Sequence, residues 1–215
     1  MSARITVVDY GVGNLYSVRR ALEYCGATDI SISSRVEDVL DAERLILPGV
    51  GAFADGMQGL RSRGLVEPIT HYAKSGRPLL GICLGMQMLA SESEEFGRHE
   101  GLNLIPGRVV PIPRFRHEDG SRLKVPFIGW TSLLPHHATF MGGCLKDMSP
   151  SGAVYLVHSF HLVPVDEANV MATYRHGTHT ITAAVRHGNI TGLQFHPEKS
   201  GKVGLRVISN FIAGP

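Results

Sequence analysis

Residues 79–89 read LLGICLGMQML, an apolar stretch in which one cysteine, Cys83, stands between two glycines. Residues 77–82 have the composition of a buried strand, and residues 84–90 are suited to a helix that follows it. A strand, the pattern Gly-x-Cys-x-Gly and a helix are together typical of a nucleophile elbow, a sharp turn that holds its central residue in a strained conformation. The stretch therefore predicts a strand, a turn and a helix, with Cys83 at the turn.

Cys83 could also be a plain structural residue. Taken alone, a cysteine in an apolar run is more often buried packing, because free cysteine behaves as a small hydrophobic group. Glycines at 81 and 85 favour the nucleophile, since small neighbours let strand and helix approach closely. The thiol would also lie at a helix N-terminus, whose partial positive charge favours the thiolate.

The first half of the chain alternates short β-branched runs with helical patterns. Such alternation implies right-handed crossovers and a mainly parallel sheet covered on both faces, a three-layer α/β fold. The expected strands are residues 4–9, 30–33, 44–47 and 77–82, and the expected helices are residues 15–25, 36–40, 57–74 and 84–90.

Beyond about residue 104 the sequence is β-rich, with short strand-like runs separated by Gly, Pro, Asn and Asp. Residues 181–185 and 190–195 are typical of a hairpin, and residues 202–212 form an amphipathic helical pattern. There is no repeat or linker, so we expect this half to extend the same sheet and residues 1–215 to form a single domain.

Composition excludes several classes of protein. The net charge is +2 with no long run of one sign, which argues against nucleic-acid and membrane-surface partners. No apolar stretch reaches the roughly 18 residues of a membrane span, and the start lacks a signal-peptide pattern. The cysteines are Cys25, Cys83 and Cys144, an odd number without a CxxC pair, so neither disulfides nor a zinc site are expected. We therefore expect a cytoplasmic protein with reduced thiols.

A cysteine nucleophile requires a base, and His196 is the best candidate among 11 histidines. It ends a strand and precedes Pro197, which favours extended geometry, and Glu198 could accept its other N–H and select the tautomer. A bland strand-end histidine beside a solvated glutamate is about as plausible for this tripeptide alone. Because catalytic groups collect at the carboxyl ends of parallel strands, we predict a triad of Cys83, His196 and Glu198.

Three further motifs have a possible functional interpretation and a plain structural one. Residues 47–51, LPGVG, also follow a strand and could turn backbone N–H groups toward an oxyanion, although an ordinary turn is equally plausible. Gly11-Val12-Gly13 does not complete a dinucleotide-binding fingerprint, because Tyr16 stands where the third glycine belongs. His158 lies in an apolar strand and is expected to be a satisfied core histidine. Asp, Glu and His show no metal-ligand cluster.

These motifs resemble the triad-type (class I) glutamine amidotransferases, which carry Gly-x-Cys-x-Gly-x-Gln and His-Pro-Glu, here residues 81–87 and 196–198. Within that family the chain is most similar to the glutaminase subunits of imidazole glycerol phosphate synthase, from histidine biosynthesis. Residues 9–14, 47–53, 155–160 and 192–200 carry this narrower resemblance. It covers essentially the whole chain and implies a flavodoxin-like α/β fold with a β-rich C-terminal extension.

The resemblance implies hydrolysis of glutamine to glutamate and ammonia without a cofactor or metal. Cys83 would attack the side-chain amide, His196 would shuttle the proton and activate water, and Glu198 would orient His196. Other residues would form or gate the oxyanion hole and hold the substrate. The implied oxyanion-hole residues are Gly49, Val50, Gly51 and Leu84, and the implied substrate-binding residues are Gln87, Ser159 and Phe160.

The resemblance also implies a heterodimer with a (β/α)₈-barrel cyclase subunit that receives the ammonia, and low turnover until that partner is bound. The implied interface residues are Asn14, Trp130 and Lys199. The chain departs from the family pattern at Phe127 and Thr131, near Trp130, and at Phe160. Two alternatives stay open: a paralogous subunit supplying ammonia to a sugar amidotransferase in surface polysaccharide biosynthesis, and a non-enzymatic flavodoxin-like binding module. The latter leaves the three triad residues unexplained.

Overall fold

A central eight-stranded sheet organises the molecule. The computed structural model describes residues 3–114, 123–136, 142–149 and 152–214. The strand order is β2-β1-β3-β4-β14-β13-β12-β9, and the pairs from β2 to β14 are parallel, as predicted. The parallel strands are β1 (Ile5–Val8), β2 (Ile30–Ser33), β3 (Arg44–Leu47), β4 (Leu79–Ile82) and β14 (Ile190–Leu193).

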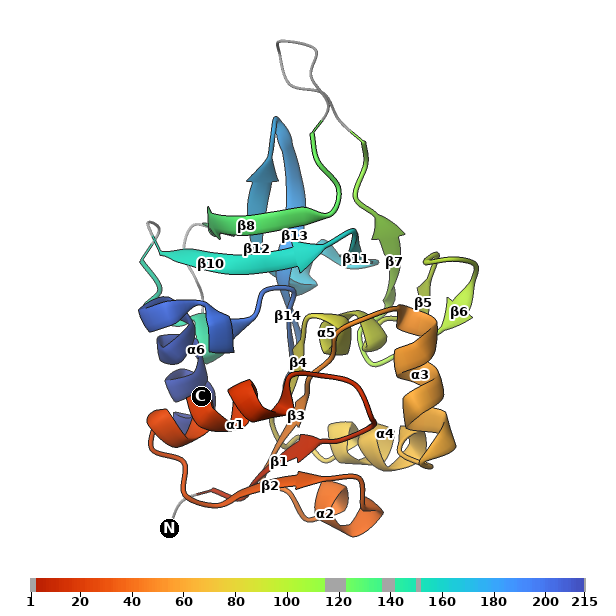
Figure 1. Cartoon of the computed structure of the whole chain (residues 1–215), viewed down its shortest axis with the longest axis vertical. Helices are drawn as coiled ribbons and strands as arrows, with labels where there is room; N and C mark the ends of the chain where they lie inside the picture. The colour runs from red at the N-terminus through yellow and green to blue at the C-terminus, as the bar shows by residue number, and fades with distance from the viewer. Residues whose placement is uncertain (1–2, 115–122, 137–141, 150–151, 215) are drawn as a thin grey trace.

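Helices cover both faces of this sheet, which confirms the predicted three-layer arrangement (Figure 1). Alternate strand residues feed two apolar cores, since successive side chains point to opposite faces. Val7 packs with the helices α1 (Leu15–Tyr24) and α6 (Gly201–Ala213). Val8 packs with the other core, which contains α2 (Val36–Leu40), α3 (Phe53–Ser62), α4 (Val66–Lys74) and α5 (Leu84–Met88).

The β-rich half only partly extends the main sheet, so the expectation of one continuous sheet was wrong for its remaining strands. β9 (Leu134–Pro135), β12 (Val170–His176) and β13 (His179–His187) do extend it, and β13 with β14 forms the predicted hairpin. Two further sheets stand apart. They contain β8 (Phe127–Ser132) with β10 (Ala153–His158), and β11 (Phe160–Pro164) with β7 (Gly107–Pro111), β5 (Glu92–Ser93) and β6 (His99–Glu100).

Ser159 marks the point at which the chain changes sheets. It stands between β10 and β11, which pair with β8 and β7 respectively. Sequence pattern identifies strands but not their partners, because pairing depends on contacts distant in sequence. The residues next to Ser159 are therefore brought to the carboxyl ends of the parallel strands by tertiary pairing.

Smaller differences concern element boundaries. The helical region predicted over residues 57–74 consists of two helices, because Gly64 takes a left-handed conformation, with φ of +64°, and ends the first. The described residues also contain three short 3₁₀ helices, η1 (Gly143–Leu145), η2 (Glu167–Asn169) and η3 (Pro197–Lys199). Within the described ranges, no helix has the length and apolar character needed to cross a membrane.

Candidate active site

Cys83 lies where β4 passes into α5, at the carboxyl end of the parallel strands. Its φ of +54° and ψ of −111° fall outside the regions that L residues ordinarily occupy, so this backbone is strained. The flanking glycines are needed for close approach: a Cβ at Gly81 would lie 2.8 Å from the Gly85 carbonyl oxygen, and a Cβ at Gly85 would collide with the Leu47 carbonyl oxygen. The turn at Cys83 thus has the geometry of a nucleophile elbow.

His196 follows β14, the strand next to β4, and is buried beside the elbow. Its backbone N–H donates to the Tyr155 carbonyl at 3.0 Å, and its Nδ1 lies 2.9 Å from Glu198 Oε1. Because the carboxylate can only accept, Nδ1 carries the proton of a neutral ring. Nε2 is buried without a hydrogen-bond partner among the described residues, while the ring interacts electrostatically with Cys83.

The electrostatics of this group favour a charged imidazole. Burial by itself lowers the pKa of His196, but the neighbouring Cys83 and Glu198 outweigh burial and raise the pKa to about 9. The side chains of His196 and Glu198 are only 2% and 1% exposed, so water screens their interaction little. An imidazolium between a thiol and a carboxylate is suited to stabilising a thiolate.

A cavity of about 270 Å³ opens above Cys83. The predicted catalytic, oxyanion-hole and substrate-binding residues that line it are Val50, Gly51, Cys83, Leu84, Gln87, Ser159, Phe160 and His196. Gly49 and Glu198 are not in its lining; Glu198 lies behind His196. The cavity also contacts Glu95, whose carboxylate accepts the Phe53 backbone N–H at the start of α3.

One of the predicted oxyanion-hole donors, Leu84, is already occupied in this structure. The Leu84 backbone N–H donates to the Gly49 carbonyl oxygen at 3.3 Å. Tyr10 restrains the same loop, since its hydroxyl donates to the Pro48 carbonyl at 2.6 Å. The loop therefore presents an acceptor to Leu84 where the predicted hole requires a neighbouring donor.

His158 is a satisfied buried histidine, as predicted, and it also lines the cavity. Its Nδ1 lies 2.8 Å from the Phe160 carbonyl oxygen and its Nε2 lies 2.9 Å from the Tyr174 hydroxyl. The departure at Phe127 falls in the same cluster, with its ring 4.8 Å from that of Tyr174 and 6.4 Å from that of His158. The departure at Phe160 places an aromatic ring 6.5 Å from Phe96.

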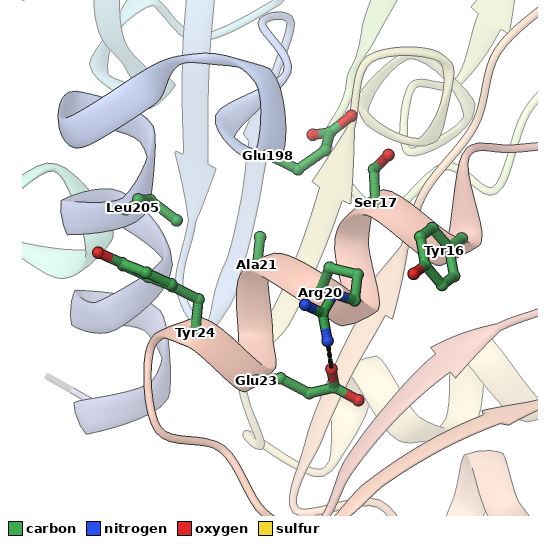
Figure 2. Close-up of a pocket in the computed structure, with 8 residues that line it drawn as sticks. All are labelled: Tyr16, Ser17, Arg20, Ala21, Glu23, Tyr24, Glu198 and Leu205. Carbon is green, nitrogen blue, oxygen red and sulfur yellow. Dashed lines mark hydrogen bonds and ion pairs between the residues drawn. The ribbon is translucent and has the colours of Figure 1, made fainter.

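The predicted interface residues lie outside the cavity. Asn14 caps α1 by accepting the Ser17 backbone N–H, whereas Trp130 on β8 and Lys199 are exposed. A separate cavity of about 570 Å³ lies between α1 and α6 and reaches Glu198, so the back of the triad borders this surface (Figure 2). Two exposed aromatic residues line this cavity, Tyr16 and Tyr24. The sequence analysis did not assign either of them to the interface.

Sequence reasoning also missed Gln194. Its side chain is fully buried, and its Nε2 lies 3.7 Å from the Cys83 sulfur. The signal that could have found it is position: Gln194 directly follows β14, the strand paired with β4, and stands two residues before His196.

Comparison with known proteins identifies the family. The glutamine amidotransferase class-I family model matches residues 6–214. The chain is 46% identical over 210 residues to imidazole glycerol phosphate synthase subunit HisH 1 of Legionella pneumophila (strain Paris), covering 97% of this chain and 98% of the relative. It is 48% identical over 212 residues to the HisH subunit of Syntrophotalea carbinolica, covering 96% and 98%.

A solved structure supports the fold. PurLQS from Thermotoga maritima superposes with a TM-score of 0.70 at 22% identity, covering 99% of each chain. This likeness shows the fold, and the family match and the full-length relatives show the family. The chain belongs to the class-I glutamine amidotransferases and, within them, to the HisH subunits of imidazole glycerol phosphate synthase.

Proposed function

We propose that this chain is the glutaminase subunit of an imidazole glycerol phosphate synthase and supplies ammonia for histidine biosynthesis. The observation that carries the proposal is the pair of Cys83 and His196 at one cavity, with the buried Glu198 carboxylate behind His196, in a chain that belongs to this family. The cytoplasmic location and the single domain expected from the sequence stay predictions.

In the proposed mechanism, the Cys83 thiolate attacks the side-chain amide carbon of glutamine. The C–N bond then breaks as the His196 imidazolium gives its proton to the leaving ammonia, which leaves a thioester on Cys83. Neutral His196 next takes a proton from water as the water oxygen attacks the thioester, and glutamate leaves with the thiolate restored. Glu198 holds the tautomer that presents Nε2 to the reacting atoms.

Both tetrahedral intermediates carry an oxyanion, for which the Leu84 N–H and an N–H of residues 49–51 are the proposed donors. Leu84 is occupied by the Gly49 carbonyl, so the loop must rotate before this hole forms. We propose that binding of the synthase partner drives this rotation, which would keep the isolated chain slow and restrict ammonia release to the assembled enzyme.

The proposed partner is a (β/α)₈-barrel cyclase subunit that forms a heterodimer with this chain. The proposed contact face carries Asn14, Trp130 and Lys199 and continues over the exposed rings of Tyr16 and Tyr24. Exposed aromatic residues are enriched in protein interfaces, which supports this choice of face.

The test is glutamine hydrolysis measured as glutamate release, by the chain alone and with the cyclase subunit and its ribonucleotide ligand. We expect slow turnover alone and an increase of orders of magnitude in the assembled, liganded enzyme. Stimulation by a sugar amidotransferase and not by the cyclase would favour the paralogous ammonia donor. Stimulated turnover that survives Cys83→Ala would show that the triad is wrong.

A further inference from the structure

Gln194 connects the nucleophile to the side of the pocket predicted to hold substrate. Its Nε2 lies 3.7 Å from the Cys83 sulfur, and its Oε1 accepts a hydrogen bond from Gln87 Nε2 at 3.1 Å. The elbow is held in register with this strand, because the Cys83 backbone N–H donates to the Leu193 carbonyl at 2.7 Å. Gln194 is thus directed at the sulfur by both its backbone and its side-chain partner.

The orientation of the Gln194 amide follows from one backbone carbonyl. The Phe160 carbonyl oxygen can only accept, so the group of Gln87 that lies 3.0 Å from it is the NH₂ group. The same NH₂ group faces Gln194, which must therefore present its oxygen to Gln87. The remaining group of Gln194, its own NH₂, is left to face the Cys83 sulfur.

The Phe160 carbonyl is in turn fixed from the opposite side. His158 Nδ1 donates to it, which leaves Nε2 as the acceptor of the Tyr174 hydroxyl proton. Burial disfavours the charged ring and lowers the pKa of His158 to about 4, so His158 stays neutral and keeps these roles near pH 7. The Phe160 carbonyl therefore accepts from both sides, from His158 and from Gln87. Gln87 also donates to Gln194, whose NH₂ group donates to the sulfur.

We propose that Gln194 is a catalytic residue that donates its side-chain N–H to the Cys83 thiolate and aims the sulfur at the substrate. A primary amide donor stabilises the anion without giving up a proton, so it does not compete with His196. It serves the thiolate twice, before attack and again when the sulfur leaves the second tetrahedral intermediate. The kinetic part rests on the proposed glutaminase function; the interaction with the thiolate does not.

The first test is the pH dependence of Cys83 alkylation by iodoacetamide, with no glutamine or partner present. Gln194→Met keeps a similar volume without a donor, and Gln194→Glu keeps an acceptor for Gln87 but places a carboxyl group beside the sulfur. Gln58→Met makes the same change on the exposed face of α3 and is the matched control. Cys83→Ser supplies the background from the other two thiols.

We expect the pH midpoint of alkylation to rise by about one unit or more in both Gln194 variants, because the thiolate loses its donor. A rise of one unit corresponds to about a tenfold loss of thiolate below the midpoint. The midpoint of Gln58→Met should equal that of the wild type. Unchanged midpoints in folded Gln194 variants would overturn the proposal. The test is separate from the proposed function. A shifted midpoint in a chain that hydrolyses no glutamine would contradict the proposed function and leave the Gln194 proposal intact.

The second test uses the wild-type chain and so does not depend on how the variants fold. The chain has three glutamines, Gln58, Gln87 and Gln194, so their side-chain amide resonances are few. We expect the Gln194 amide ¹⁵N–¹H resonances to shift with the same pH midpoint as Cys83 alkylation, and this shift to disappear in Cys83→Ser. Gln194 resonances that do not respond to the ionisation of Cys83 would overturn the proposal.

Discussion

The two sides of the active-site pocket are built differently. On one side Cys83 follows a parallel strand, and contacts with backbone atoms, such as that between Gly85 and the Leu47 carbonyl, determine its turn. On the other side Ser159 stands between two different sheets, and side-chain hydrogen bonds such as those of His158 hold the chain. Backbone contacts tolerate no added atom, whereas side-chain bonds can be lost singly. We therefore expect large effects on the elbow side and graded effects on the other.

The largest effect is expected for Cys83→Ala in the assembled enzyme. Removal of the attacking sulfur should lower glutamine turnover at least about 10³-fold while circular dichroism stays unchanged. Cys25→Ala is the matched control, because Cys25 is half-buried at the end of α1, where its sulfur donates to the Leu205 carbonyl of α6, and should leave turnover near wild type. Residual turnover within tenfold of wild type would show that Cys83 is not the nucleophile.

Glu198→Gln should lower stimulated turnover roughly 10²- to 10⁴-fold, because His196 loses the carboxylate that orients it. It should also change stability with pH. The pKa of His196 is raised from 6.5 to about 9 in the folded chain, so the protonated His196 ring stabilises the folded state. This contribution to the free energy of unfolding is complete below pH 6.5 and is lost as pH rises through 9. Urea unfolding should therefore separate variant from wild type most at pH 6 and least near pH 9.5. A difference independent of pH would contradict this.

The comparison can be sharpened with two glycines. Gly85→Ala places a Cβ against the Leu47 carbonyl and should lower the free energy of unfolding by about 3 kcal/mol or more. Gly188→Ala, in the turn between β13 and β14, has a φ of +58° but no atom within 4 Å, so it should cost only about 1–2 kcal/mol. Denaturant unfolding measures both. Equal costs would show that the elbow is not held by close approach.

The smallest effect is expected for Tyr174→Phe. Loss of the proton donated to His158 Nε2 should lower the free energy of unfolding by about 1 kcal/mol. The pH midpoint of Cys83 alkylation should stay near wild type, because His158 and Gln87 still donate to the Phe160 carbonyl. Tyr24→Phe, at an exposed ring, should change neither quantity. A large midpoint shift in Tyr174→Phe would show that the two sides of the pocket are strongly coupled.

Much of the fold and of the candidate site was accessible from sequence because the signals are local. Alternating runs identified the parallel strands and their helices, and Gly-x-Cys-x-Gly placed Cys83 at a turn that the structure bears out with a positive φ. His196 and Glu198 are two residues apart, so their hydrogen bond could be expected from short-range geometry. Each of these inferences uses residues within a few positions of one another.

The sequence by itself predicted the parallel strands, the elbow and a triad of Cys83, His196 and Glu198, because periodicity, turn chemistry and short spacing act over a few residues. Only the tertiary structure decided which strands pair around Ser159, that the Gly49 carbonyl occupies the Leu84 N–H, and that Gln194 turns its NH₂ group to Cys83. These depend on atoms separated by tens of residues or more. Local sequence does not specify which donor bonds to which acceptor, because the packing of the sheets determines those pairs.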